Sequence, residues 1–275
     1  MGKGDLMGYS AQEMIQKRKS VRTFDGRALS DEHIRALEEH IRSAENPFGV
    51  PVEFRLLDAQ KYGLSSPVIV GEGMYLAAKV KRVPYYEMAF GYSFEEMCLF
   101  ALSLGIGTVM LAASLSRSAC EKALEVGADE VMPAASPLGY PAGKRSLRDT
   151  LMRKGLKADE RLPFGKLFFA SDFTHPLSDE NPFAIPLSMA RLAPSATNKQ
   201  PWRAVVSGNR VHFYEYKTLK DSPLGDVQKV DIGIALAHFD LTEKENGHSG
   251  QFSASDPQLA LPPNTHYIIS YERTA

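Results

Sequence analysis

Residues 191–202 read RLAPSATNKQPW, a dense cluster of amide and hydroxyl side chains behind an apolar segment of helical character. Asn198 and Gln200 can each donate and accept hydrogen bonds, and the Ser195 hydroxyl can do both. Pro194 is expected to end the preceding helix. The cluster could serve only as a cap and a turn. Its mixed donors and acceptors also suit the edge of a flat heterocycle, such as a pterin, a flavin or a base.

A second cluster is basic. Residues 17–22 read KRKSVR, where the short helical segment SAQEMIQKRK passes into the extended VRTF. Arg18, Ser20 and Arg22 alternate along the extended part, so their side chains share one face and could grip a phosphate or a carbonyl-rich ring edge. The alternative is a solvated helix end, where cations complement the helix dipole.

Two glycine-containing stretches accompany these clusters. Residues 139–146 read GYPAGKRS, in which glycine and proline supply a turn while Lys144 and Arg145 supply charge. Alone this is a basic loop, and beside residues 17–22 it would complete a phosphate site. Residues 105–107 read GIG without the dinucleotide fingerprint, which predicts a tight turn from helix to strand.

The elements that must position these clusters occur in the same order twice: a helix, a proline before a strand, a further strand and a long apolar helix. The matching pairs are LSDE at 29–32 and 177–180, VPVEFRLL at 50–57 and QPWRAVV at 200–206, SSPVIVG at 65–71 and NRVHFYEY at 209–216, and YSFEEMCLFALSLG at 92–105 and VDIGIALAHFDL at 230–241. We therefore predict a duplicated α+β unit. The first half is expected over residues 9–150, a connector over 151–161 and the second half over 162–275.

The composition is that of an ordinary globular protein, with 275 residues of which 44% are hydrophobic and 24% charged. A formal net charge of -1 carries no signature of polyanion binding, so neither nucleic acid nor a membrane surface is expected as a partner. Residues 97–116 are uncharged and long enough to span a bilayer, but their glycines predict a buried helix turning into a buried strand.

The two cysteines, Cys98 and Cys120, are too few for a disulfide framework and fit a reducing compartment. The start of the sequence lacks the apolar stretch of an export signal. We expect a cytoplasmic protein.

RKSVRTF, APSATNKQPW, GIG after the central helix and GYPAGKR after a strand together resemble the FMN-dependent nitroreductase family. In most members the amide-rich element soon follows the arginine motif, whereas here it lies in the second half and SAENPFGVPV (43–52) stands in its expected place. The arrangement is similar to a branch in which two nitroreductase-like halves are fused and mimic the family homodimer. The resemblance implies an α+β fold of two duplicated α/β/α halves.

In that family FMN lies at the dimer interface, between the arginine motif of one subunit and the amide-rich loop of the other. The resemblance therefore assigns to the flavin phosphate, ribityl chain and pyrimidine edge the residues Arg18, Lys19, Ser20 and Arg22, with Lys144 and Arg145 joining the phosphate. The residues expected to approach the ring from the other half are Pro194, Ser195, Ala196, Asn198 and Gln200. The residues matching the backbone N–H groups near the flavin N5 are Leu111, Ala112 and Ala113, on the strand expected after GIG.

The implied activity is ping-pong transfer of a hydride from NADH or NADPH, through N5 of FMN, to a nitroaromatic, quinone or similar small acceptor. No catalytic side chain and no metal is expected, because the histidines are scattered. Two alternatives stay open: a flavin-binding protein without turnover, serving as a sensor or store, and a dehalogenase or dehydrogenase of the same family. Because each motif occurs once, we expect one FMN per chain and a chain able to work as a monomer.

Overall fold

The computed structural model describes residues 8–144 and 146–274. The chain divides into two compact units, a first unit of residues 17–158 and a second unit of residues 159–274 together with 8–16. The boundary lies inside the predicted connector. Helix α1 (Ala11–Lys17) begins in the second unit, although the predicted first half started at Tyr9. Long-range contacts explain this difference, because the Gln12 backbone N–H donates to Glu245 at 2.9 Å and its side chain donates to Asn246 at 3.0 Å.

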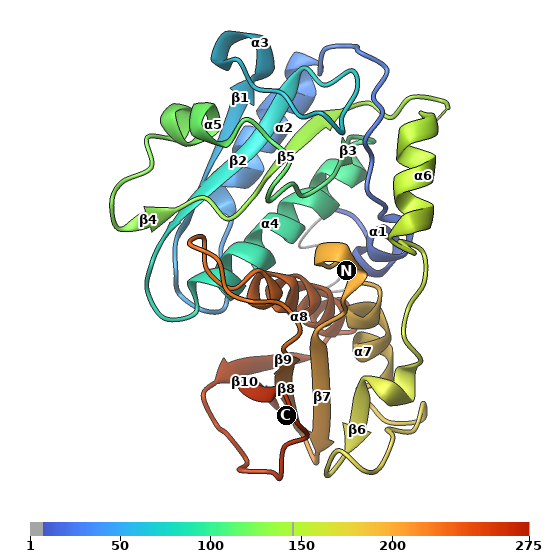
Figure 1. Ribbon diagram of the computed structural model, residues 1–275. Helices are drawn as coiled ribbons and strands as arrows, with labels where there is room; N and C mark the ends of the chain where they lie inside the picture. Colours follow the sequence, from blue (N-terminus) through green and yellow to red (C-terminus); the bar gives the residue numbers. More distant parts are fainter. Residues whose placement is uncertain (1–7, 145, 275) are drawn as a thin grey trace. The chain divides into compact units, whose positions relative to one another are not determined.

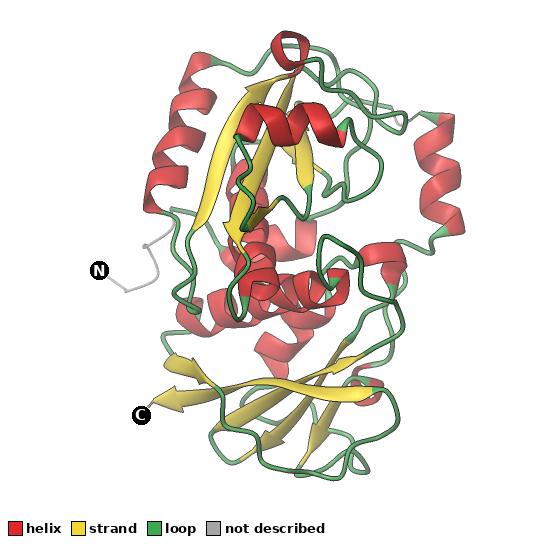
Figure 2. Cartoon of the chain, turned by 60° about the vertical axis from the view of Figure 1, so that its left-hand side comes forward, coloured by secondary structure: helices red, strands yellow, loops and turns green. Residues whose placement is uncertain are grey.

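The first unit is a five-stranded sheet with helices on both faces (Figures 1 and 2). Its elements are α2 (Asp31–Ser43), β1 (Val52–Asp58), α3 (Ala59–Tyr62), β2 (Met74–Lys81), α4 (Tyr86–Ser103), β3 (Gly107–Thr108), α5 (Arg117–Leu124), β4 (Glu130–Val131), β5 (Ala135–Gly139) and α6 (Leu147–Gly155). The strand order is β1-β2-β5-β3, and β4 pairs with β2. The Phe54 ring faces Phe94 of α4 at 5.9 Å, whereas Tyr75 packs with Leu124 of α5. The sheet is consequently covered on both faces, and β2 is buried along most of its length.

The second unit is also built on a five-stranded sheet, in the order β6-β7-β8-β10-β9. Beside α1, its elements are the 3₁₀ turn η1 (Phe164–Lys166), β6 (Phe168–Ala170), α7 (Ala184–Arg191), the 3₁₀ turn η2 (Ala196–Asn198), β7 (Trp202–Ser207), β8 (Arg210–Tyr216), α8 (Val227–Glu245), β9 (Ser249–Ser253) and β10 (Thr265–Thr274). Helices α7 and α8 pack together over this sheet (Figure 1). Phe239 of α8 meets the rings of Phe213 at 5.2 Å and Tyr271 at 5.0 Å, which forms the core between helix and sheet.

The order of elements recurs between the units. Strands β1-β2-β5-β3 of the first unit match β7-β8-β10-β9 of the second, in both chain order and neighbour order. In each unit the long buried helix, α4 or α8, follows the second strand of the hairpin. This confirms the predicted α+β fold. Strand β6, parallel to β7, has no counterpart among the described strands of the first unit.

Two local predictions are wrong, and proline explains both. SSPVIVG (65–71) forms a turn with one bridge, from Val70 to Thr23, because Pro67 has no N–H to give to a ladder. The second LSDE (177–180) does not begin a helix, since α7 starts only at Ala184. Asn181 precedes Pro182, and a residue before proline is disfavoured in helical conformation.

Helix α4 ends at Ser103, and the GIG turn leads into β3, as predicted for residues 97–116. Among the described residues, no helix has the length and apolar character needed to cross a membrane. Cys98 and Cys120 are both buried free thiols.

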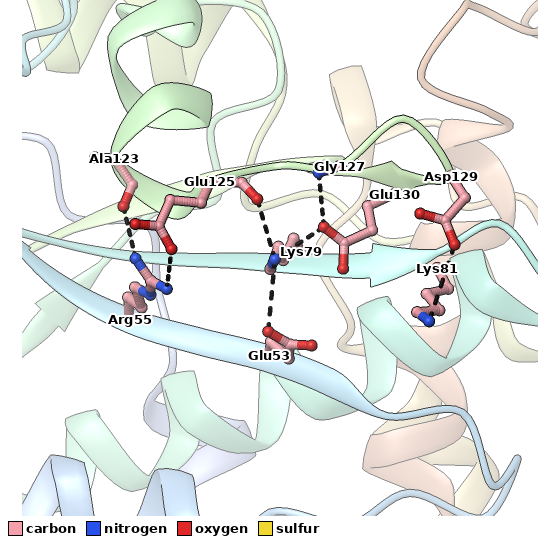
Figure 3. Close-up of polar contacts among 9 residues, drawn as sticks. All are labelled: Glu53, Arg55, Lys79, Lys81, Ala123, Glu125, Gly127, Asp129 and Glu130. Atoms are coloured by element: carbon pink, nitrogen blue, oxygen red, sulfur yellow. Dashed lines mark hydrogen bonds and ion pairs between the residues drawn. The ribbon is translucent and has the colours of Figure 1, made fainter.

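A row of charged side chains lies on strands β1 and β2, beside the turn before β4 (Figure 3). At its centre the Lys79 ammonium lies 2.8 Å from a Glu130 oxygen, 3.2 Å from the Glu125 carbonyl oxygen and 3.6 Å from Glu53. The side chains of Lys79 and Glu130 are only 12% and 9% exposed. Lys81 contacts Asp129 at 3.9 Å with both side chains well exposed. The two lysines thus differ in burial on one strand.

We expect Lys79→Met to lower the free energy of unfolding by about 1–3 kcal/mol, because it leaves a half-buried carboxylate without its cation. Lys81→Met, the matched control on the same strand, should change it by less than about 0.5 kcal/mol. Chemical denaturation of both variants checks this expectation. Equal losses from the two substitutions would show that burial of the Lys79 pair carries no extra weight.

Candidate functional site

The basic segment, residues 17–24, begins at the last residue of α1 and then runs through the first unit as an extended chain. The Val21 N–H donates to the Thr108 carbonyl of β3 at 2.9 Å. On its other side, the Ala142 N–H donates to the Thr23 carbonyl at 3.0 Å. These bonds join the basic segment to the GYPAGK loop (residues 139–144), the neighbour it would need for a phosphate site.

Two glycines allow this close approach. A Cβ atom at Gly107 would lie 2.8 Å from the Val21 side chain, and one at Gly139 would lie 2.9 Å from the Phe24 ring. Real Cβ atoms do not tolerate such distances, so a side chain at either position would push the basic segment away. The glycines of the GIG and GYP stretches thus allow the basic segment to pack closely against them.

The two predicted arginines are each held by a buried carboxylate. The Arg18 Nε lies 3.6 Å from Glu95 of α4, with side-chain exposures of 9% and 2%. The Arg22 Nη1 lies 3.3 Å from Asp149 of α6, with exposures of 12% and 3%. Pairing fixes the position of each guanidinium and offsets its charge.

The exposed positive charge comes from lysines. Lys19 and Lys144 are both exposed, whereas Arg145 lies outside the described residues. The start of α6 adjoins the basic segment, since the Ser146 N–H donates to the Thr23 hydroxyl at 3.2 Å and the Ser146 hydroxyl accepts from the Asp149 N–H at 3.1 Å. Among the residues that the structure describes, no buried acid pairs with either lysine, so their charges are available to an anion.

Tyr140 fixes the other end of the loop. Its hydroxyl accepts from the Ser30 N–H at 3.2 Å and lies 2.9 Å from the His33 Nδ1, at the start of α2. The Arg27 guanidinium stacks over the Tyr140 ring, 4.9 Å from its centroid. The GYPAGK loop is thereby anchored to both α2 and the basic segment.

The strand expected at residues 111–113 is reduced to one bridge. The strand after GIG is β3, and Leu111 pairs with Ala135, donating its N–H at 2.8 Å and accepting at 3.1 Å. The Ala112 carbonyl accepts from Arg117. Because the Leu111 N–H is bonded within the sheet, only the N–H groups of Ala112 and Ala113 stay predictions for contact with a flavin.

The amide loop, residues 194–200, lies in the second unit between α7 and β7. Thr197, Asn198 and Gln200 have φ angles of 50°, 56° and 49°. The left-handed region costs a residue with a side chain about 1–2 kcal/mol, and more for a β-branched one such as threonine. Strain of this kind persists only where surrounding contacts fix it, and it concentrates at binding sites.

The predicted amide side chains supply part of that fixation. The Asn198 side chain donates to the Glu160 carbonyl at 3.1 Å, and the Gln200 Oε1 accepts from the Leu162 N–H at 2.9 Å. The Gln200 N–H donates to the Ser195 hydroxyl at 2.9 Å, which closes the loop on itself. Asn198 and Gln200 therefore shape the loop by holding residues 160–162.

A buried acid, missed by the motif analysis, holds the start of the loop. Both carboxylate oxygens of Asp231 in α8 lie 3.0 Å from the Ala196 nitrogen, which donates to them. Burial raises the pKa of Asp231 well above its usual value, and the bond from Ala196 opposes that shift. The signal for Asp231, as for Glu95, is a carboxylate at the edge of the apolar run of its helix, because a buried acid needs a partner.

A second buried acid lies across from Trp202, the first residue of β7. Glu215 pairs in register with Trp202 and is 1% exposed. Burial, followed by the Asp226 carboxylate, raises its pKa to about 7, while Lys217 and Lys229 oppose the shift. The folded protein therefore binds more protons at this site than the unfolded chain.

This contribution to stability is complete below a pH of about 4.5 and is lost as the pH rises through about 7. Relative to Glu215→Gln, which does not titrate, the wild-type protein should lose on the order of 1–3 kcal/mol of unfolding free energy between about pH 5 and pH 8. Denaturation series over that range measure the difference. Parallel pH profiles for the two proteins would contradict the raised pKa.

Comparison with known proteins gives these segments a context. The family model described as "Putative TM nitroreductase" matches residues 10–243. The crystal structure of a "putative nitroreductase" from Thermotoga maritima shares 21% sequence identity with this chain. The match covers 96% of this chain and 92% of the Thermotoga chain, with a TM-score of 0.62. An "oxidoreductase containing FMN" shares 16% identity over 59% of this chain and 92% of its own, with a TM-score of 0.50. No curated protein matches the chain.

At such identities the two structures speak for the fold alone, and they confirm the predicted nitroreductase-like architecture. Among the residues that the structure describes, no three histidine, cysteine, aspartate or glutamate side chains gather in a way that could hold a metal ion. The segments available for binding chemistry are the basic segment with its GYPAGK loop, and the amide loop.

Proposed function

The chain belongs to the nitroreductase family whose model it matches over residues 10–243, and from that premise we propose that it is an FMN-dependent oxidoreductase. Its electrons come from NADH or NADPH and pass to a small acceptor such as a nitroaromatic or a quinone. The family match is the observation that carries this proposal. The matched residues include the basic segment, the GYPAGK loop and the amide loop.

The chemistry of the first unit's donors fits a phosphate. Lys19 and Lys144 are exposed cations, and residues 139–144 are hydrogen-bonded alongside the basic segment. Backbone N–H groups at the start of a helix, as in α6, also favour an anion. In the proposal, the residues that hold the FMN phosphate are Lys19, Lys144 and Arg145. Arg18, Ser20 and Arg22 then hold the ribityl chain and the pyrimidine edge.

The amide loop fits the edge of a ring. Pro194 and Ser195 are partly exposed, and the strained backbone beyond them is rigidly held. In the proposal these residues and Ala196 contact the flavin, while Asn198 and Gln200 act through the shape of the loop. A preformed loop binds with less loss of conformational freedom than a mobile one.

FMN, when bound, would supply the hydride chemistry that links reduced nicotinamide to the acceptor. The protein contributes binding and electrostatics. A guanidinium fixed by a buried carboxylate, as Arg18 is by Glu95, keeps its position as charge develops near it. A cation beside the pyrimidine edge stabilises negative charge that appears there.

We expect the protein saturated with FMN to lose its visible flavin absorbance when NADH or NADPH is added without oxygen, and to regain it on addition of a nitroaromatic or a quinone. The reason is that both half-reactions pass through the same bound cofactor. Anaerobic absorbance spectroscopy is the measurement, with free FMN as the control for reduction in solution. Full FMN occupancy without bleaching by either nicotinamide would leave a flavin-binding protein without turnover.

A further inference from the structure

We propose that Asp231 is a positioning residue of the cofactor site, whose buried carboxylate holds the Ala196 amide near the start of the amide loop and so keeps the loop in the shape that meets FMN. The inference rests on the proposed function for its ligand. Its structural part, the attachment of the loop to α8, concerns the second unit alone and is measurable without FMN.

The attachment is short and buried. Asp231 is 3% exposed, and both of its oxygens lie 3.0 Å from the Ala196 nitrogen. Within the described part of the chain, Ala196 is the only residue that hydrogen-bonds to this carboxylate. A buried polar group without a partner costs about 2–7 kcal/mol. Loss of this bond therefore penalises both the acid and the amide, which favours the loop conformation that keeps it.

The position of the bond makes it effective. Ala196 is the first residue of η2, and Ser195 before it is extended, with φ of -146° and ψ of 158°. The left-handed residues Thr197, Asn198 and Gln200 follow directly. Holding the Ala196 amide fixes the direction in which the chain enters this strained run. Asp231 thus secures the loop at its start, as the Ser195 hydroxyl does at its end by accepting from the Gln200 N–H.

Four substitutions separate positioning from a general contribution to the core. Asp231→Ala removes the acceptor, whereas Asp231→Asn retains an oxygen that can accept from Ala196. Asp240→Ala is the matched control, because Asp240 is also buried in α8 but pairs with Lys244 at 2.8 Å. Ala196→Pro removes the donor from the other side, at a helical first position after an extended residue, where proline is tolerated.

FMN dissociation constants are compared at a temperature where every variant is folded. We expect Asp231→Ala to weaken FMN by about tenfold or more, the effect of one lost hydrogen bond. Asp231→Asn and Asp240→Ala should stay within about threefold of wild type, even where Asp240→Ala lowers stability. The double variant Asp231→Ala/Ala196→Pro should be no weaker than the more affected single variant, because both remove the same bond.

Hydrogen exchange without FMN provides the second readout. The Ala196 amide should be protected in wild type and in Asp231→Asn and should exchange about tenfold faster or more in Asp231→Ala. Unchanged FMN affinity in Asp231→Ala, or additive losses in the double variant, would overturn the positioning role. Failure of wild type to bind FMN would overturn the proposed function instead, and the exchange result would still decide whether Asp231 holds the loop.

Discussion

A carboxylate withdrawn from water needs a partner, and in each unit this requirement ties the central helix to a segment predicted to bind the cofactor. Glu95 of α4 pairs with Arg18 of the basic segment, and Asp231 of α8 accepts from Ala196 of the amide loop. Both helices are packed against their sheet and their neighbouring helix. An acid on the inner side of such a helix has no access to solvent. Its partner must therefore be a donor in the chain segment that packs against that helix.

This constraint gives the two kinds of basic residue different tasks. Arg18 and Arg22 are held in place by carboxylates and contribute fixed donors, with little net charge. Lys19 and Lys144 are exposed on flexible stems and contribute charge without fixed geometry. The proposed site would combine preset hydrogen bonds with lysines that can adapt to a phosphate. The fixed donors also avoid the ordering cost that a mobile side chain incurs on binding.

The sequence predicts elements whose signal is local. The apolar runs that became α4 and α8, the strands after Pro51 and Pro201, and the α+β order could all be read from periodicity and turn residues. Where a proline overrides the pattern, as Pro67 does in residues 65–71 and Pro182 does after the second LSDE, the same reading fails. The failure can be corrected from local sequence too, because proline lacks an N–H for a strand ladder and disfavours helical conformation in the residue before it.

What the sequence could not supply is partnership between distant residues. Asn198 and Gln200 have the donors and acceptors of a ligand-binding pair, yet both bond to backbone groups of residues 160–162, and the Asn198 oxygen also accepts from the Arg161 guanidinium. Gln12 ties α1 to the end of α8 for the same reason, through contacts that no periodicity encodes. The buried acids could be found as anomalies in apolar helices, although the groups they hold could not.

We propose that one basic segment and one amide loop per chain serve one FMN. The most direct measurement is titration of the protein with FMN, followed by the ratio of bound flavin to chain from absorbance after removal of free cofactor. The account predicts one FMN per chain. Saturation at two flavins per chain would contradict it. So would a protein that retains no FMN after incubation with excess cofactor.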